Sequence, residues 1–234
     1  MTMAVLEAHD VHKTYIGGDG NVLNVLNGVN LSVQRGEMIA IVGASGAGKS
    51  TLMHVLGALD EPSKGYVVIG GEPVQGRNET QLGELRNRTV GFVFQFHHLL
   101  REFSALENVM MPMRIAGKPE GEAHSRAAEL LARVGLSARM THRPAELSGG
   151  EQQRTAVARA LAMDPQVVLA DEPSGNLDRM NGEILHELLT EVVNDLEIGM
   201  VVVTHNRSLS ARANRVLLLE GGRLSETAVD EVVV

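Results

Sequence analysis

Short apolar runs alternate along this chain with segments in which apolar residues recur every three or four positions. The runs predict strands, and those at 37–43, 167–172 and 200–205 are typical of buried parallel strands. The expected strands are EMIAIVG (37–43), YVVIG (66–70), VGFVFQF (90–96), VVLADE (167–172) and MVVVTH (200–205).

Between the last two strands, the segment NGEILHELLTEVVNDL predicts an amphipathic helix. Its apolar residues recur at the spacing that places them on one side of a helix, and this side is expected to pack on the sheet. The expected buried residues are Ile184, Leu185, Leu188, Leu189, Val192, Val193 and Leu196.

The same patterns divide the chain into parts. The first 35 residues predict a small antiparallel sheet of short strands with turns at GGDGN and LNGVN. From about 97 to 150 helical patterns replace strands, as in EGEAHSRAAELLARVG. We therefore expect a single domain, 1–234, with a core at about 1–96 and 164–234 and a helical subdomain at about 97–163. The segment RVLLLEGGRLSE predicts a closing hairpin, with no room beyond it for a regulatory domain.

Composition narrows the classes of function. The chain has 234 residues and a net charge of −8, which disfavours a nucleic-acid partner because such domains usually carry a basic surface. It has no cysteine, which excludes disulfides and Cys-based zinc sites. No apolar run approaches the ~18–20 residues that cross a bilayer, and the acidic start is unlike a signal peptide. We expect a soluble protein whose membrane role, if any, depends on a partner.

The segment GASGAGKS (43–50) fits the phosphate-loop pattern, and it lies between a predicted strand and a predicted helix. Glycines in this loop let several backbone N–H groups point at one anion, and the start of the helix adds positive charge. Lys49 is expected to reach the β- and γ-phosphates and Ser50 to ligate Mg²⁺. The alternative is a simple glycine-rich turn. The expected ATP-binding residues are Gly43, Ala44, Ser45, Gly46, Ala47, Gly48, Lys49, Ser50 and Thr51.

Two acids end the strand predicted at 167–172. Asp171 lies where ligands gather at the carboxyl end of a parallel sheet, and it is the candidate metal ligand. Glu172 is the candidate that orients or deprotonates the attacking water. The alternative is that this Asp-Glu-Pro sequence only ends the strand.

Three further residues have weaker signals. Phe92, Phe94 and Phe96 alternate and so are expected to share one face, which turns Gln95 to the opposite face, toward metal or water. His205 ends a predicted strand, where a histidine is usually only hydrogen-bonded. Tyr15, one of two tyrosines, could be ordinary surface packing.

A second glycine-rich loop, LSGGEQQR (147–154), begins another helix. Ser148 and Glu151 have the spacing of a capping box, which by itself explains a helix start. The two glycines between them, Gly149 and Gly150, leave N–H groups at that start, and such groups bind anions.

This second loop resembles the signature sequence of ATP-binding-cassette (ABC) ATPases, and the other motifs of that family follow in its order over nearly the whole chain. They are Tyr15 as the adenine-stacking aromatic residue, 43–50 as Walker A, Gln95 as the Q-loop, 167–172 as Walker B, Ser174–Asp178 as the D-loop and His205 as the switch histidine.

The resemblance implies an α/β fold, with a P-loop NTPase core of mostly parallel sheet, an N-terminal antiparallel β subdomain and an inserted α-helical subdomain. It also implies that two copies of the chain pack head to tail, so that the signature of one copy caps the ATP bound by the other. Glu172 and His205 would then position water for attack on the γ-phosphate, with Mg²⁺ held by Ser50, Gln95 and Asp171. The residues acting in trans would be Ser148, Gly149, Gly150 and Glu151, with Asp178 in the D-loop.

The segment ADEPSGNLD resembles the cassettes of lipoprotein-releasing, macrolide-export and cell-division systems, and FQFHHLLREFSALENVMMP is most similar to the ATPases of lipoprotein release. Arg101 and Ser174 depart from that pattern, where proline and threonine are commoner. The resemblance implies membrane permease subunits that dock near Gln95–Pro112, at the cytoplasmic face of the bacterial inner membrane. We expect the pair His97-His98 to belong to this docking surface rather than to a metal site.

Other functions remain alternatives at this stage. The same ATPase could serve a macrolide-export complex or a cell-division complex that transmits force. A soluble ABC protein acting on nucleic acid or ribosomes is disfavoured by the single cassette and the acidic charge. A monomeric P-loop kinase is disfavoured because it has no use for the second loop.

Overall fold

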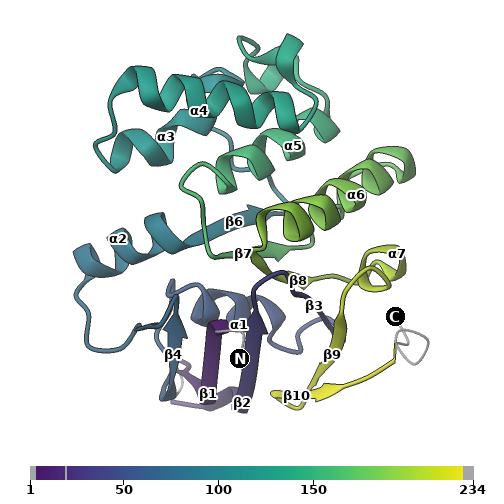
Figure 1. Ribbon diagram of the computed structural model, residues 1–234. Helices are drawn as coiled ribbons and strands as arrows, with labels where there is room; N and C mark the ends of the chain where they lie inside the picture. Colours follow the sequence, from purple (N-terminus) through teal and green to yellow (C-terminus); the bar gives the residue numbers. More distant parts are fainter. Residues whose placement is uncertain (1–3, 19, 229–234) are drawn as a thin grey trace.

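The centre of the molecule is a six-stranded sheet in a computed structural model that describes residues 4–18 and 20–228 (Figure 1). Among these residues only β9 and β10 pair antiparallel in this sheet, so the expected mostly parallel sheet is confirmed. In spatial order the strands are β10 (Arg223–Glu226), β9 (Arg215–Glu220), β3 (Met38–Val42), β8 (Gly199–Val203), β7 (Val167–Asp171) and β6 (Val90–Phe94).

The register of the parallel strands aligns their carboxyl ends. Phe94 of β6 pairs with Asp171 of β7, which in turn pairs with Val203 of β8. The loops that follow these strands therefore leave the sheet side by side at one edge, where ligands of parallel sheets bind.

A second, antiparallel sheet lies at the bottom of Figure 1. Its strands are β2 (Val22–Gln34), β1 (Ala4–Ile16), β4 (Lys64–Ile69) and β5 (Glu72–Pro73). The predicted antiparallel sheet is thus present, and a turn joins β1 to β2 at 17–21, of which residue 19 lies outside the described part. The predicted turn at LNGVN is wrong, because these residues lie inside β2. Gly28 has φ +80° there, and the pairing register changes beside it, so this glycine forms an irregularity in a continuous strand.

The described segment 97–163 contains helices and no strand. Its longer helices lie together at the top of Figure 1, away from the antiparallel sheet. No helix among the described residues is long and apolar enough to cross a membrane. The helices of the chain are α1 (Lys49–Leu56), α2 (Glu79–Thr89), α3 (Ala105–Ile115), α4 (Glu120–Arg133), η1 (Ser137–Arg139), η2 (Pro144–Glu146), α5 (Gly149–Ala160), α6 (Arg179–Leu196) and α7 (Arg207–Ser210).

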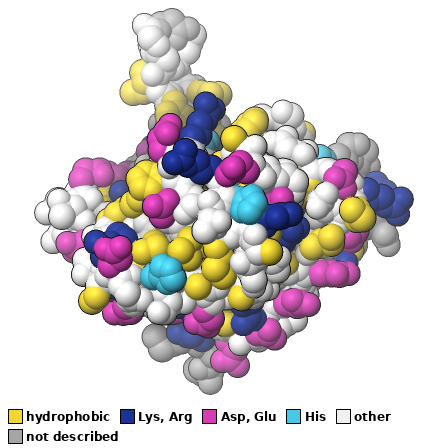
Figure 2. Space-filling model, turned by 90° about the horizontal axis from the view of Figure 1, so that it is seen from above, with side chains coloured by type: hydrophobic (Ala, Val, Ile, Leu, Met, Phe, Trp, Pro, Cys, Tyr) yellow, Lys and Arg dark blue, Asp and Glu magenta, His cyan; other side chains and the backbone are white. Residues whose placement is uncertain are grey.

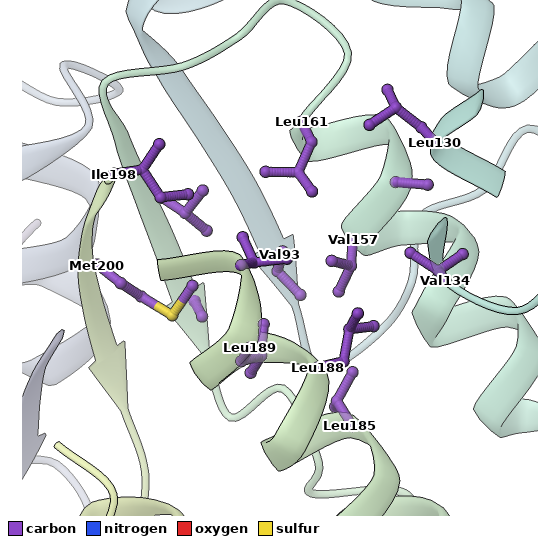
Figure 3. Close-up of a cluster of buried hydrophobic side chains, with 14 of the residues drawn as sticks. Val93, Leu130, Val134, Val157, Leu161, Leu185, Leu188, Leu189, Ile198 and Met200 are labelled. Atoms are coloured by element: carbon purple, nitrogen blue, oxygen red, sulfur yellow. The ribbon is translucent and has the colours of Figure 1, made fainter. Parts of the chain in front are cut away.

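Two apolar cores flank the central sheet. One joins it to α1 and the antiparallel sheet, and the other joins it to α3–α6. Figure 3 shows part of this second core, in which Leu185, Leu188 and Leu189 of α6 lie between Met200 of β8 and Val157 of α5. Each fully buried side chain of this kind contributes about 1.5–3 kcal/mol relative to an exposed one. The two cores hold the antiparallel sheet and the helical segment on opposite faces of one rigid support.

The predicted buried face of α6 needs one correction. Ile184 is 42% exposed, whereas His186 is 1% exposed and its Nε2 lies 2.9 Å from the hydroxyl of Ser174. Successive helix residues are turned by about 100°, and Ile184 lies beyond one edge of the buried arc while His186 lies inside the other. A buried histidine is tolerated here because Ser174 gives its ring a hydrogen-bond partner.

On the described surface of Figure 2, Lys and Arg side chains are interspersed with Asp and Glu, and hydrophobic side chains form groups between them. The excess of negative charge is therefore spread across this face rather than gathered in one patch.

Candidate nucleotide-binding site

A cavity of about 490 Å³ opens at the carboxyl edge of the central sheet and reaches the antiparallel sheet. Leu23, Val25 and Val203 complete a lining that is otherwise made of residues singled out in the sequence. These are Tyr15, Ser45, Gly46, Gly48, Lys49, Ser50, Thr51, Gln95, Asp171 and Glu172.

The phosphate loop leaves β3 and enters α1 directly. Gly43 has φ +153°, and a Cβ at this position would lie 2.5 Å from the carbonyl oxygen of Leu219, so only glycine fits. The ammonium of Lys49 donates to the carbonyls of Gly43 and Ala44 at 2.8 and 3.0 Å. No side chain caps the start of α1, which leaves its first N–H groups to bind an anion.

Three predicted residues of the loop do not line this cavity. Gly43 supports the turn, and Ala44 and Ala47 line a neighbouring hollow of about 290 Å³ beside β9.

The candidate metal ligands lie within contact of each other although they are far apart in the sequence. The hydroxyl of Ser50 donates to Oδ2 of Asp171 at 3.2 Å. Burial, followed by the nearby charge of Glu172, raises the pKa of Asp171. A cation at this carboxylate would relieve both effects. No group of three or more His, Cys, Asp or Glu side chains that could hold a metal occurs in the part of the chain that the structure describes, so a cation here would depend on hydroxyl, amide and phosphate oxygens as well.

Glu172 and His205 form a hydrogen-bonded pair at the edge of the cavity. Nδ1 of His205 lies 2.8 Å from Oε1 of Glu172, and the His205 backbone N–H lies 3.4 Å from Oε2. Glu172 has φ +45°, an uncommon backbone conformation for a non-glycine residue, and its N–H donates to the carbonyl of Val203. His205 does not itself line the cavity, and 60% of its side chain is exposed.

Gln95 lines the cavity from the loop after β6, because the strand ends at Phe94 and not at Phe96. Phe92 and Phe94 stack at 5.7 Å as the alternation predicts, but Phe96 lies beyond the strand and is 66% exposed. The expected shared face therefore holds for two of the three phenylalanines.

The amide of Gln95 is held by a residue that the sequence reasoning missed. Its Nε2 donates to Oδ1 of Asn176, and Nδ2 of Asn176 donates back to the Gln95 carbonyl. Asn176 lies within the D-loop segment, which was the available signal. A Cβ at Gly175 would lie 2.9 Å from the same Nε2, so this glycine makes room for the contact.

The second glycine loop begins α5 with a complete capping box. Ser148 accepts from the Glu151 N–H, and Glu151 accepts from the Ser148 N–H at 2.8 Å and from Arg139 at 2.9 Å. These hydrogen bonds, the one from the Ser148 backbone first, lower the pKa of Glu151 to about 2.

The start of α5 packs on the start of α6. A Cβ at Gly150 would lie 2.5 Å from Oδ1 of Asn181, while Asn181 donates to Asp178, the cap of α6. None of the residues 148–151, nor Asp178, lines the cavity of their own chain. The two glycine loops are thus parts of separate surfaces in one copy.

The comparisons with known proteins agree with this geometry. The family model described as ABC transporter matches residues 26–175. The chain is 52% identical over 221 residues to the lipoprotein-releasing system ATP-binding protein LolD of Geobacter metallireducens, covering 94% of this chain and 98% of the relative. It is 52% identical over 224 residues to the protein of the same name from Myxococcus xanthus, covering 96% and 100%.

A solved structure is similar to this chain over nearly its whole length. The dimeric ATP-binding cassette MJ0796 in a post-hydrolysis state, bound to ADP and Pi, superposes with a TM-score of 0.87 at 35% identity, covering 96% of this chain and 98% of that one. The fold and the cavity define a P-loop nucleotide hydrolase. The chain belongs to the ABC transporter family, in which it is an ATP-binding, ATP-hydrolysing cassette.

Proposed function

We propose that this chain is the ATPase subunit of a transporter that releases lipoproteins from the bacterial inner membrane for transport to the outer membrane. The proposal is supported by the name of the relatives from Geobacter metallireducens and Myxococcus xanthus, which are 52% identical over almost their whole length. The chain would lie at the cytoplasmic face, attached through permease subunits. Its division into a core at about 1–96 and 164–234 and a helical subdomain at about 97–163 is part of the same proposal.

The observation that carries the catalytic part is the aligned register of Phe94, Asp171 and Val203, after which Gln95, Glu172 and His205 leave the sheet together. The phosphate loop, with Lys49 and the N–H groups of α1, binds the phosphates of ATP. Tyr15 supports the purine.

Glu172 acts on the water that attacks the γ-phosphate. Its Oε1 is engaged by Nδ1 of His205 at 2.8 Å, whereas Oε2 has only the 3.4 Å contact from the His205 N–H. Oε2 is therefore the atom that orients the water and accepts its proton, and His205 fixes the carboxylate while it does so.

Mg²⁺ fits the oxygen atoms of Ser50 and Asp171, because this cation prefers hard oxygen ligands and is commonly held by one carboxylate together with substrate phosphates. Gln95 would add an amide oxygen. Burial raises the pKa of Asp171, and a bound cation would oppose this effect by favouring the charged carboxylate. When bound, the ion neutralises charge on the phosphates.

A second copy of the chain completes the site. The support is that residues 148–151 lie outside the cavity of their own chain, while the similar cassette MJ0796 is a dimer. Ser148, Gly149, Gly150 and Glu151 of one copy would contact the ATP of the other, with Asp178 beside them.

The permease would dock on Gln95–Pro112. Leu100 and Phe103 are 42% and 36% exposed, and a hollow of about 310 Å³ is lined by Leu99 and Arg101 among others. Exposed apolar groups of this kind mark binding surfaces. Arg159 of α5 donates to the carbonyls of His97 and His98, so this surface is tied to the signature helix.

The substitution Glu172→Gln tests the catalytic assignment. It keeps the shape of the side chain but removes the proton acceptor, so ATP binding should persist while turnover falls by at least about 10²-fold. ATP should then accumulate a dimer on size-exclusion chromatography. Hydrolysis near the wild-type rate would remove Glu172 from this role. Copurification of lipoproteins with the membrane complex separates lipoprotein release from macrolide export and cell division.

A further inference from the structure

The ring of Tyr15 lies between the cavity and a buried cation. Tyr15 lines the cavity and is 39% exposed, whereas Lys13, whose Nζ lies 5.0 Å from the centre of the ring, is not among the lining residues. Lys13 and Tyr15 are two positions apart on β1 and so point to the same side of that strand. One face of the ring is thus covered by Lys13, and the ring is open to the cavity.

Asp60, which follows α1, holds both side chains. Its Oδ2 accepts from the Tyr15 hydroxyl at 2.8 Å, and its Oδ1 accepts from Nζ of Lys13 at 2.6 Å. Lys13 is 9% exposed and donates also to the Glu61 carbonyl at 2.7 Å. Both oxygens of the Asp60 carboxylate therefore accept hydrogen bonds from side chains of β1.

The protonation states of Asp60 and Tyr15 favour the hydrogen bond that fixes the Tyr15 ring. Burial alone would raise the pKa of Asp60, but the hydrogen bonds from Lys13 and Tyr15 lower it, so Asp60 is a carboxylate. Burial and the hydrogen bond to Asp60 raise the pKa of Tyr15, so Tyr15 remains a phenol that can donate. The backbone is fixed as well, because Ser63 accepts from the Thr14 N–H at 3.0 Å.

We propose that Asp60, with Lys13, is a positioning residue that holds the ring of Tyr15 flat against the base of the bound nucleotide. This inference rests on the proposed ATP site. It assigns Asp60 to the recognition of nucleotides that carry a planar base, and it gives Asp60 no part in phosphate binding or hydrolysis. The segment after the phosphate-loop helix thereby sets the geometry of the base site.

The test compares ATP with inorganic tripolyphosphate, which has no base, by calorimetric titration of the full chain with Mg²⁺. Tyr15→Phe removes only the hydroxyl, and Asp60→Asn removes the charge and replaces one of the two acceptor oxygens by an amide NH₂ donor. Each should raise the Kd for ATP by about five-fold, the usual effect of one hydrogen bond. The double variant should be no weaker than the weaker single one. The Kd for tripolyphosphate should not change, because this ligand has no base to contact Tyr15.

Tyr66→Phe is the matched control, because Tyr66 is the other tyrosine, is 47% exposed and stacks on His9. It should leave the Kd for ATP unchanged. In this background Tyr15 is the sole tyrosine, so its ionisation can be followed by ultraviolet absorbance. Asp60→Asn should lower the Tyr15 pKa, a readout that reports the contact even where a variant is less stable.

Several outcomes would overturn the inference. Additive effects of the two substitutions, an equal loss of tripolyphosphate affinity, or an unchanged Tyr15 pKa would mean that Asp60 has only a structural role. The proposed base site has its own control: if Tyr15→Ala leaves the Kd for ATP unchanged, Tyr15 does not contact the base, and the failure lies in that assignment rather than in the role of Asp60.

Discussion

Glu151 combines a structural position with a proposed functional one in a single side chain. It closes the capping box of α5 and accepts from Arg139, and these contacts lower its pKa to about 2 from an ordinary value of 4.5. A carboxyl whose pKa is lower in the folded state stabilises the fold fully above the unfolded pKa, and this contribution is lost as pH falls toward the folded pKa.

The stability of the chain should therefore depend on Glu151 in a defined pH range. Glu151→Gln should lower the melting temperature at about pH 6, and the difference from the wild type should shrink as pH falls from about 4.5 toward 2. Thermal unfolding of both proteins over this range measures the difference. A difference that does not change with pH would mean that the charge of Glu151 contributes nothing.

Residue patterns alone singled out Asp171, Glu172 and the phosphate loop, because each belongs to a short motif beside a strand, and the structure brings both acids and most of the loop to one cavity. They could not foresee Asp60, which lies 45 residues from Tyr15 and becomes its neighbour only when β1 packs beside the end of α1. Asn176 was likewise missed, because its contact with Gln95 spans 81 residues.

Among the elements, the starts of α5 and α6 are in close contact at one of two adjacent glycines. A side chain at Gly150 would meet Asn181, which donates to the cap Asp178, whereas a Cβ at Gly149 would have no neighbour nearer than 3.7 Å. The fold therefore has room for a Cβ at Gly149 but not at the adjacent Gly150.

We expect Gly150→Ala to lower the free energy of unfolding by about 1 kcal/mol, since Asn181 must move and the cap of α6 is weakened. Gly149→Ala, the matched control, should leave stability unchanged or raise it, because alanine is the better helix former. Denaturant unfolding of both variants measures these changes. Equal effects of the two substitutions would contradict the packing argument.

The elements themselves were largely predictable, since apolar runs identify buried strands and a 3.6-residue period identifies α6. The predictions were wrong where tertiary packing, and not the local sequence pattern, determined the structure. Ile184 was assigned to the core because it is apolar, but the buried arc ends before it and includes His186 instead. The glycine in LNGVN indicated a turn, but in the fold Gly28 interrupts the register of a long strand.

For the whole molecule, the proposed docking surface predicts a separation of activities. Leu100→Glu should weaken binding to detergent-solubilised permease at least about ten-fold, because it places a charge in an apolar contact. ATP hydrolysis by the free chain should be unchanged. Pull-down and ATPase assays measure the two properties.

Ile115→Glu is the matched control, because Ile115 is 72% exposed on α3 and lies beyond Pro112. It should preserve both activities. If Leu100→Glu instead lowers the melting temperature strongly, Leu100 belongs to the core and the docking surface lies elsewhere.

The lysine of the phosphate loop has a consequence for the entropy of binding. The ammonium of Lys49 already has two acceptors in its own loop, the carbonyls of Gly43 and Ala44. A long flexible side chain usually loses about 0.5–1.5 kcal/mol of rotational freedom when a ligand immobilises it. Here that freedom is lost when the chain folds, so in the proposed ATP site the loop is pre-organised, and more of the attraction between lysine and phosphate would remain to hold the nucleotide.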